Sequence, residues 1–227
     1  MTPEERELEA LIEETGLDSA VRMRLARYGA LVLAANRRLN LTGAKTPAEL
    51  AEHVRDSLTV IPYVRERYVD VGSGAGFPAI PIALVTGLEV TLIEATAKKA
   101  HFLERALEEL NLRGCVVAAR AESAARDLQL RDAFFSGTIR AVGSASAVAE
   151  LLLPFIAPGG VAVLQRGSTD DPERAALSDA ALVLGGEIES EHPVGDRRCI
   201  FLVRKKRATP ERFPRRNGIP QKRPLCG

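Results

Sequence analysis

The chain has 227 residues, which is enough for one well-packed α/β domain with a small extension. Its net charge of +1 hides an asymmetry, because residues 204–227 hold nine lysines and arginines and one glutamate, whereas acidic residues outnumber basic ones in the rest of the chain. The sequence lacks a run of about 18 apolar residues, which argues against a membrane-spanning helix, and its three cysteines and three scattered histidines predict neither a disulfide framework nor a metal site.

Residues 1–65 are predicted to form a helical cap. Thr2-Pro-Glu-Glu5 and Thr46-Pro-Ala-Glu49 both match the capping box, with proline at the first helical position. Asp18 is a suitable cap for a helix between them. Apolar residues follow it at alternating spacings of four and three, which is typical of a helix with one buried face.

Strand and helix patterns alternate over residues 66–204, which predicts an α/β domain with a mostly parallel seven-stranded sheet. The expected strands are 67–71, 89–94, 115–119, 137–142, 160–165, 181–190 and 199–204. The expected helices are 77–86, 97–111, 144–156 and 171–180. No clear helix joins the last two strands, so we expect an antiparallel hairpin at that edge. Residues 205–227, which we call the tail, are rich in proline and predicted to be irregular.

The most informative stretch is Asp70-Val-Gly-Ser-Gly-Ala-Gly76, at the end of the first strand. Gly72 and Gly74 allow a sharp turn and a close approach of the backbone to a ligand. Glu94 ends the second strand, where an acid suits the two hydroxyl groups of a ribose. Together these residues predict a site for a cofactor that contains a nucleoside.

Two cofactors fit this general pattern, S-adenosylmethionine and NAD. A dinucleotide fingerprint requires a third glycine at the position of Phe77. Asp70 lies just before the turn, where its charge would repel a pyrophosphate but suit an ammonium and a sulfonium. The sequence therefore favours S-adenosylmethionine, with an NAD-dependent oxidoreductase as the weaker alternative.

The order of several motifs resembles the RsmG/GidB family of bacterial 16S rRNA methyltransferases. The motifs are Asn40-Leu-Thr42, His53-x-x-Asp56-Ser57-Leu58, Asp70 to Pro78, Arg120-x-Glu122, Arg140-Ala141, Arg166-Gly167 and Phe213 to Leu225. The resemblance implies a Rossmann-like, class I S-adenosylmethionine-dependent methyltransferase fold behind an N-terminal helical cap. It also implies transfer of a methyl group to N7 of one guanine in a decoding-region loop of 16S rRNA, in the small ribosomal subunit.

The resemblance also assigns the cofactor site residue by residue. The expected cofactor-binding residues are Gly72, Gly74, Phe77, Glu94, Ala95, Thr96, Ala121, Glu122 and Arg140. Among these, Glu94 corresponds to the acid that binds the ribose, and Ala121 and Glu122 to the pair that borders the adenine. Guanine N7 has a lone pair and no proton at neutral pH, so no residue is assigned to proton transfer.

The residues expected to contact RNA are Asn40, His53, Arg166, Arg198, Arg215 and Arg216. Structural roles compete with several of these assignments. Asn40 is equally suited to end the second helix, and His53 and Asp56, three apart, favour a local pair. For Arg140 the alternative is a buried ion pair with Asp70, Glu94 or Glu122.

The chain departs from the family pattern mainly where RNA would bind. Ala79 replaces a glycine, and Arg166-Gly167 replaces Lys-Gly, which keeps the charge but not the geometry. Arg198-Cys199 stands where the family often has Arg-His. Two further alternatives therefore stay open: a methyltransferase for a protein or small molecule, and a ribosome-binding module without catalysis. We expect a cytoplasmic monomer.

Overall fold

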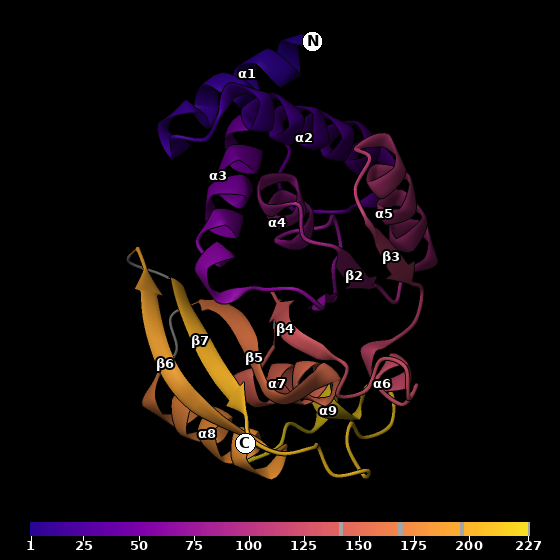
Figure 1. Cartoon of the computed structure of the whole chain (residues 1–227), viewed down its shortest axis with the longest axis vertical. Helices are drawn as coiled ribbons and strands as arrows, with labels where there is room; N and C mark the ends of the chain where they lie inside the picture. Colours follow the sequence, from indigo (N-terminus) through magenta and orange to yellow (C-terminus); the bar gives the residue numbers. More distant parts are fainter. Residues whose placement is uncertain (141–142, 168–169, 196–197, 227) are drawn as a thin grey trace.

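The protein is built on one seven-stranded sheet, seen nearly edge-on in the computed structural model (Figure 1). The structure describes residues 1–140, 143–167, 170–195 and 198–226. Its strands are β1 (Tyr68–Val71), β2 (Val90–Ile93), β3 (Gly114–Val117), β4 (Phe134–Ile139), β5 (Ile156–Gly167), β6 (Gly186–Val194) and β7 (Arg198–Lys205). They lie in the order β3-β2-β1-β4-β5-β7-β6, and β7 runs antiparallel to both of its neighbours. The predicted edge hairpin of β6 and β7 is thus confirmed.

The first five strands of the chain are parallel to one another, and β3 forms one edge of the sheet. All four residues of β1 are buried, as expected for a strand with helices on both faces. In the register of β1 with β4, Val69 lies opposite Gly137. A Cβ on Gly137 would lie 3.0 Å from Val69 Cγ1 and 2.7 Å from Ile156 Cδ1, so close packing explains this glycine.

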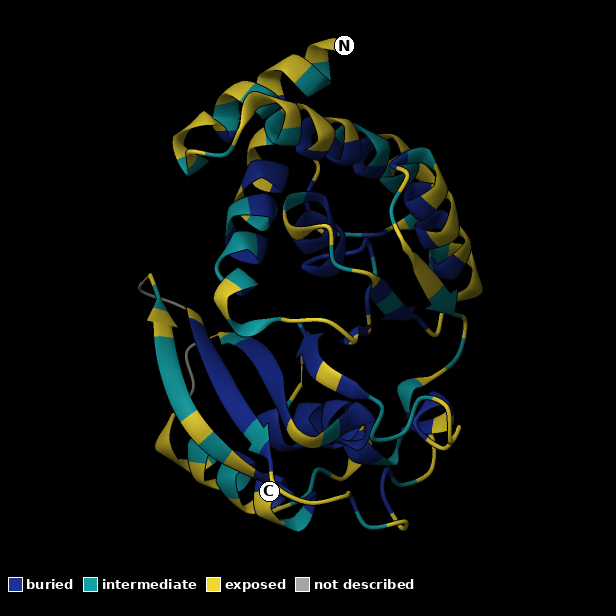
Figure 2. Cartoon of the chain, in the orientation of Figure 1, coloured by how far each residue is buried: buried dark blue, intermediate teal, exposed yellow. Residues whose placement is uncertain are grey.

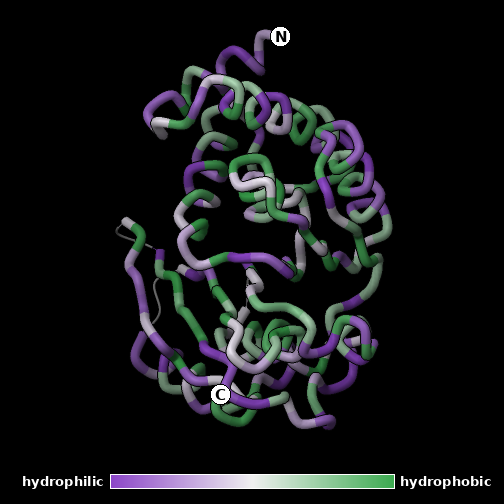
Figure 3. Tube along the Cα trace, viewed as in Figure 1, coloured by the Kyte–Doolittle hydropathy of each residue, from purple (hydrophilic) through white to green (hydrophobic). Residues whose placement is uncertain are grey.

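Helices cover both faces of the sheet. They are α1 (Pro3–Leu11), α2 (Ser19–Leu39), α3 (Pro47–Leu58), α4 (Ala79–Thr86), α5 (Ala97–Glu109), α6 (Ala121–Ala124), α7 (Ala145–Leu152), α8 (Asp171–Val183) and α9 (Ile219–Lys222). The helices α1 to α5 share one apolar core with the sheet, and α6 to α8 share the other. Buried residues line both cores in Figure 2, and α4, the most apolar of the helices near the centre, is largely green in Figure 3.

The N-terminal helices begin where the sequence predicted. The side chains of Thr2 and Thr46 each accept a hydrogen bond from the backbone of the glutamate three residues later, and both capping boxes are complete. Asp18 caps α2 through the N–H of Ala20. None of the helices among the described residues is long and apolar enough to span a membrane.

Three strand predictions were wrong in their bounds, and one of them is the fourth strand, β4, which begins at Phe134 instead of 137. Residues 181–183 end α8 rather than opening a strand, and β6 begins at Gly186. Leu177, Ala181 and Leu184 are buried at helical spacing, so the apolar run belongs to the helix core. Strand β5 also begins earlier than expected, at Ile156 instead of 160, and residues 141–142 of the predicted fourth strand lie outside the described residues.

The tail packs against α6 and α7 instead of extending from the body. Phe213 is buried, and the side chain of Arg131 donates hydrogen bonds to the backbone carbonyls of Phe213 and Thr209. Arg215 donates to both carboxylate oxygens of Glu150, whose side chain is fully buried. The tail is irregular except for the single-turn helix α9, and it is held by specific polar contacts.

Candidate active site

The glycine-rich loop joins the carboxyl end of β1 to α4. Gly72, Gly74 and Gly76 all have positive φ angles, of 72°, 56° and 101°, which other residues rarely adopt. The N–H groups of Gly72 and Ser73 donate to the carbonyl of Ile93 at 2.8 and 3.1 Å, which ties the loop to the end of β2. A Cβ at Gly76 would lie 2.6 Å from Ile80 Cδ1, so packing as well as conformation requires glycine there.

Glu94 holds the loop from the end of the neighbouring strand. Its carboxylate accepts hydrogen bonds from the N–H of Gly74 at 2.9 Å and from the N–H of Thr96 at 2.7 Å. The side chain is buried. Each carboxylate oxygen has a further lone pair, so Glu94 still has the capacity to accept hydrogen bonds from a diol.

Asp70 lies beneath the loop and is buried. Thr138 donates a hydrogen bond to its Oδ1 at 2.6 Å, and Oδ2 has no hydrogen-bond partner among the described residues. Burial raises the pKa of Asp70 to about 7. An unpartnered carboxylate oxygen at this position would be stabilised by a nearby cation.

Phe77 follows the loop and is the centre of a ring cluster. Its ring lies 5.2 Å from that of Tyr28 and 5.4 Å from that of His53, and the guanidinium of Arg140 lies 5.3 Å above its centroid. The hydroxyl of Tyr28 donates to the carbonyl of Ala75 at 2.7 Å. The cluster thus joins α2, α3, the loop and the end of β4.

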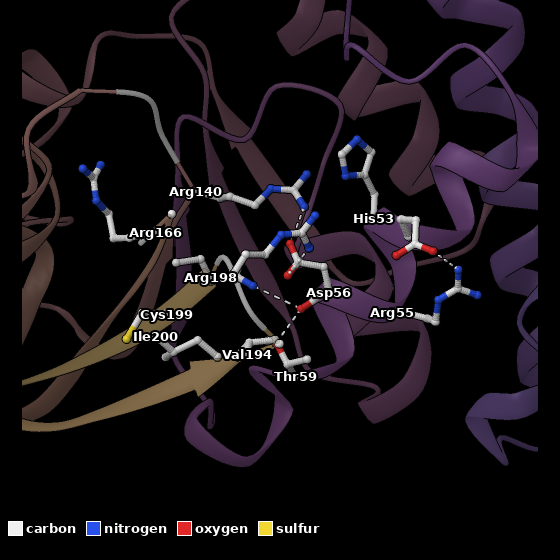
Figure 4. Close-up of a pocket in the computed structure, with 14 residues that line it drawn as sticks. His53, Arg55, Asp56, Thr59, Arg140, Arg166, Val194, Arg198, Cys199 and Ile200 are labelled. Atoms are coloured by element: carbon white, nitrogen blue, oxygen red, sulfur yellow. Dashed lines mark hydrogen bonds and ion pairs between the residues drawn. The ribbon is translucent and has the colours of Figure 1, made fainter. Parts of the chain in front are cut away.

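Asp56, on α3, forms ion pairs with two arginines, one just after the end of β4 and the other at the start of β7. One oxygen pairs with Arg140 at 3.2 Å and the other with Arg198 at 2.7 Å (Figure 4). Gln165 donates to the backbone carbonyl of Asp56 at 3.1 Å. Arg140 does form an ion pair, as the structural alternative held, but its partner is Asp56 and not one of the three acids expected.

His53 does not pair with Asp56, contrary to the favoured interpretation. Its Nε2 lies 3.3 Å from the hydroxyl of Thr42, and its Nδ1 is buried with no partner in the described part of the chain. Burial, with the nearby charge of Arg140, lowers the pKa of His53 below its ordinary value. The ring is therefore neutral at pH 7.

A cavity of about 840 Å³ opens between α3 and the carboxyl ends of β4 and β5 (Figure 4). Its lining holds four arginines and two acids, so the walls carry excess positive charge. These residues are Arg55, Arg140, Arg166, Arg198, Glu52 and Asp56. Gln165 also lines the cavity, and its buried Oε1 lacks a hydrogen-bond partner among the described residues.

Comparison with known proteins identifies the family of the chain. Residues 22–200 match the family model described as GidB, rRNA small subunit methyltransferase G. A ribosomal RNA small subunit methyltransferase G from Deinococcus deserti is 39% identical, over 99% of this chain and 98% of its own. The chain belongs to the rRNA small subunit methyltransferase G family. Another relative of that name, from Nostoc punctiforme, is 39% identical over 86% of each chain.

The solved structures that resemble this member of the methyltransferase G family share its fold. A crystal structure of M. jannaschii TYW2 in complex with AdoMet has a TM-score of 0.54 at 15% identity, over 67% of this chain and 76% of that one. A geranyl diphosphate methyltransferase in complex with GPP and sinefungin also has a TM-score of 0.54, at 12% identity, over 70% of this chain and 81% of that one. These likenesses confirm the Rossmann-like methyltransferase fold and carry no substrate assignment.

The structure groups most of the expected cofactor residues at one edge of the sheet. Glu94, Ala95 and Thr96 follow β2 beside the loop, and Ala121 and Glu122 open α6 shortly after β3. Glu122 is buried and accepts a hydrogen bond from the N–H of Gly218 at 2.7 Å, so the tail contacts one of the residues expected to border the adenine. Their roles toward a cofactor stay predictions.

The residues expected to contact RNA are divided between several places. His53 and Arg198 line the cavity, as does Arg166, which donates to Glu173 at 2.5 Å and to the carbonyl of Gly143 at 2.6 Å. Arg215 is engaged by Glu150, Arg216 is exposed, and Ala141 of the Arg140-Ala141 motif lies outside the described residues.

Asn40 has the structural role that competed with its RNA assignment. It ends α2 in the left-handed conformation, with φ of 48°, and is exposed. Its contact with RNA stays a prediction.

The sequence did not single out Gln165 of the cavity, Thr138 beside Asp70, or Glu150, which holds the tail. Each is a polar residue within an otherwise apolar strand or helix, and all three are buried. A polar residue at an apolar position was the available signal, because buried polar groups normally have a partner.

Proposed function

We propose that this protein transfers a methyl group from S-adenosylmethionine to N7 of a guanine in a decoding-region loop of 16S rRNA. Membership of the methyltransferase G family supports the reaction class. The juxtaposition of a glycine loop, fixed by Glu94, with a positively charged cavity at the ends of β4 and β5 supports the division into a cofactor site and an RNA site. Open α/β sheets bind ligands at this edge.

Three features of the loop fit S-adenosylmethionine. A Cβ at Gly72 would meet no atom within 4 Å, so the backbone is open to a ligand. Glu94 lies beside the loop and has free lone pairs for the hydroxyl groups of a ribose, and the buried Oδ2 of Asp70 has no partner among the described residues, which suits a cationic ligand. A pyrophosphate beside Asp70 would instead be repelled, which argues against NAD.

In this proposal the target guanine enters the arginine-rich cavity next to His53 and Arg140, whose side chains also lie close to the ring of Phe77. When bound, the cofactor supplies a methyl group on a positively charged sulfur, and the methyl carbon passes to guanine N7 while the sulfur keeps the bonding electron pair. The chain's own residues have to bind the base and align N7, which is catalysis by proximity. Gln165 offers an acceptor for the N–H groups of guanine, and Arg198 is placed for a phosphate.

No residue needs to move a proton in this reaction, because N7 carries none at neutral pH. His53 is neutral and lines the cavity, which suits a contact to the base and not the role of a general acid. The reacting base has to leave its stack to reach the cavity, and the surrounding RNA is then held by its loop shape and its phosphates.

Methyl transfer from radiolabelled S-adenosylmethionine to small ribosomal subunits that lack this modification tests the proposal. We expect label at a single guanine, identified by strand cleavage at N7-methylguanine. The variant Glu94→Ala should lose cofactor affinity and, with it, labelling. Cofactor binding without label on subunits or free 16S rRNA would overturn the RNA assignment and point to another substrate. Binding of neither cofactor nor RNA would overturn the proposal as a whole.

A further inference from the structure

A second concavity lies between α2 and α5, on the side of the cofactor loop away from the arginine-rich cavity. It encloses about 530 Å³. Its floor is apolar and includes Leu31, Ala35 and Phe102. Its rim carries Arg37, Arg38, Lys98, His101 and Arg105, against one acid, Glu109. We call this concavity the α2–α5 groove.

The positive charge is greatest at the end of the groove nearest the cofactor loop. Arg105 pairs with Glu109 at 2.9 Å, and Arg37 lies 4.0 Å from Glu4. In the part of the chain that the structure describes, Arg38 and Lys98 have no ion-pair partner, and both are exposed. Two unpaired cations on neighbouring helices can bind one or two phosphates without first breaking an internal ion pair.

The groove is connected to the active site through residues 40–44. Arg38 lies in the last turn of α2, and Lys98 in the first turn of α5, two residues after Thr96. The carbonyl of Leu41 would lie 3.7 Å from a Cβ on Gly74, and Thr42 contacts His53 in the wall of the arginine-rich cavity. One short segment thus separates the two basic concavities.

We propose that the α2–α5 groove binds the phosphates of RNA nucleotides that flank the target guanine. The inference rests on the proposed function. An RNA strand whose target base enters the arginine-rich cavity would cross residues 40–44, where Asn40 is exposed, and continue into the groove. Arg38 and Lys98 contact its phosphates, and the apolar floor receives a ribose or base face.

Neutralising the two unpaired cations tests the groove without changing the helices, since glutamine has helix propensity similar to that of arginine and lysine. The variant carries Arg38→Gln and Lys98→Gln. The matched control carries Arg27→Gln and Lys99→Gln, which remove the same charge from α2 and α5 outside the groove lining. Affinity for small ribosomal subunits is measured over a range of salt concentrations, and cofactor affinity is measured by calorimetry.

We expect the groove variant to bind subunits several-fold more weakly than the control, with unchanged cofactor affinity. Each lost phosphate contact should lower the slope of log K against log salt by about 0.7, or about 1.4 for both contacts to single-stranded RNA. An unchanged slope would overturn the inference while the methyl-transfer assay still supports the function. A parent chain that binds no RNA would overturn both.

A photo-crosslinking side chain at position 34, on the exposed floor of the groove, identifies the occupant. Crosslinking to 16S rRNA near the modified guanine supports the proposal. Crosslinking to a ribosomal protein alone would overturn it, because the charged groove would then serve a protein surface.

Discussion

The ion pair between Arg215 and Glu150 fastens the tail to α7, and its removal should destabilise the fold. Arg215 contacts Glu150 through its backbone N–H and its side chain, with distances of 2.6 to 3.0 Å. The Glu150 side chain is fully buried, whereas that of Arg215 is 26% exposed. In Arg215→Ala the carboxylate therefore stays in the interior without its cation.

The expected cost follows from that burial. Leaving a buried charge unpaired costs about 3–5 kcal/mol, and we take about 3 kcal/mol because solvent reaches the arginine side of the pair. For a chain of this length each kcal/mol lowers Tm by about 2–4 °C, so Tm should fall by about 6–12 °C. Urea unfolding and a thermal scan measure both quantities.

The adjacent residue supplies the control. Arg216 is exposed, and Arg216→Ala should leave Tm within about 1 °C of the parent, as expected for a surface change. The double variant Glu150→Leu, Arg215→Met should recover most of the loss, since apolar residues of similar volume replace buried ion pairs at little cost.

An unchanged Tm for Arg215→Ala would refute this reasoning. If RNA affinity fell instead, Arg215 would be a phosphate contact, as the sequence suggested. If stability falls and the salt dependence of RNA binding stays that of the parent, its role is structural.

Three further predictions concern the cofactor loop and the arginine-rich cavity. The pKa of Asp70 is about 7 in the folded state against an ordinary 3.8, so the folded chain holds a proton that the unfolded chain loses; the free energy of unfolding should fall from pH 4 to pH 7. The unfolding free energy of Asp70→Asn should therefore rise relative to that of the parent as the pH increases. If urea unfolding gives the same difference between variant and parent at pH 5 and at pH 8, the prediction is contradicted. Gly76→Ala should lower the free energy of unfolding by at least about 1–2 kcal/mol. It should also weaken cofactor binding, measured by calorimetry, because the new Cβ would collide with Ile80 and shift the loop. Normal cofactor affinity would argue against this explanation. Arg198→Ala should weaken RNA binding and lower stability by less than about 1 kcal/mol, since this side chain is 45% exposed and Arg140 still neutralises Asp56; a larger loss would show a structural role.

Local patterns predicted most of the fold. The capping boxes at Thr2 and Thr46 fixed the starts of two helices, because a cap depends only on residues three apart. The glycine loop and Glu94 were predictable for a related reason: parallel strands bring their carboxyl ends to one edge, so the acid after β2 has to lie near the loop after β1.

The cavity could not be predicted in the same way. Asp56, Arg140 and Arg198 come from α3, the end of β4 and the start of β7, and only the folded sheet brings them together. The spacing of His53 and Asp56 favoured a local pair, but two arginines from distant strands compete for the carboxylate and are closer to it. The run 181–184 was ambiguous because apolar residues there suit a strand or a buried helix face.

The packing of the tail has a consequence for the synthesis of the chain. Glu150 is made 65 residues before its partner Arg215, and Glu122 is made 96 residues before Gly218. A nascent or prematurely terminated chain that ends before Arg215 leaves the Glu150 carboxylate without its cation, which penalises the closed packing of α7. We therefore expect a chain truncated before Arg215 to be less stable, and to be cut faster by proteases, than the chain that includes residues 215–226.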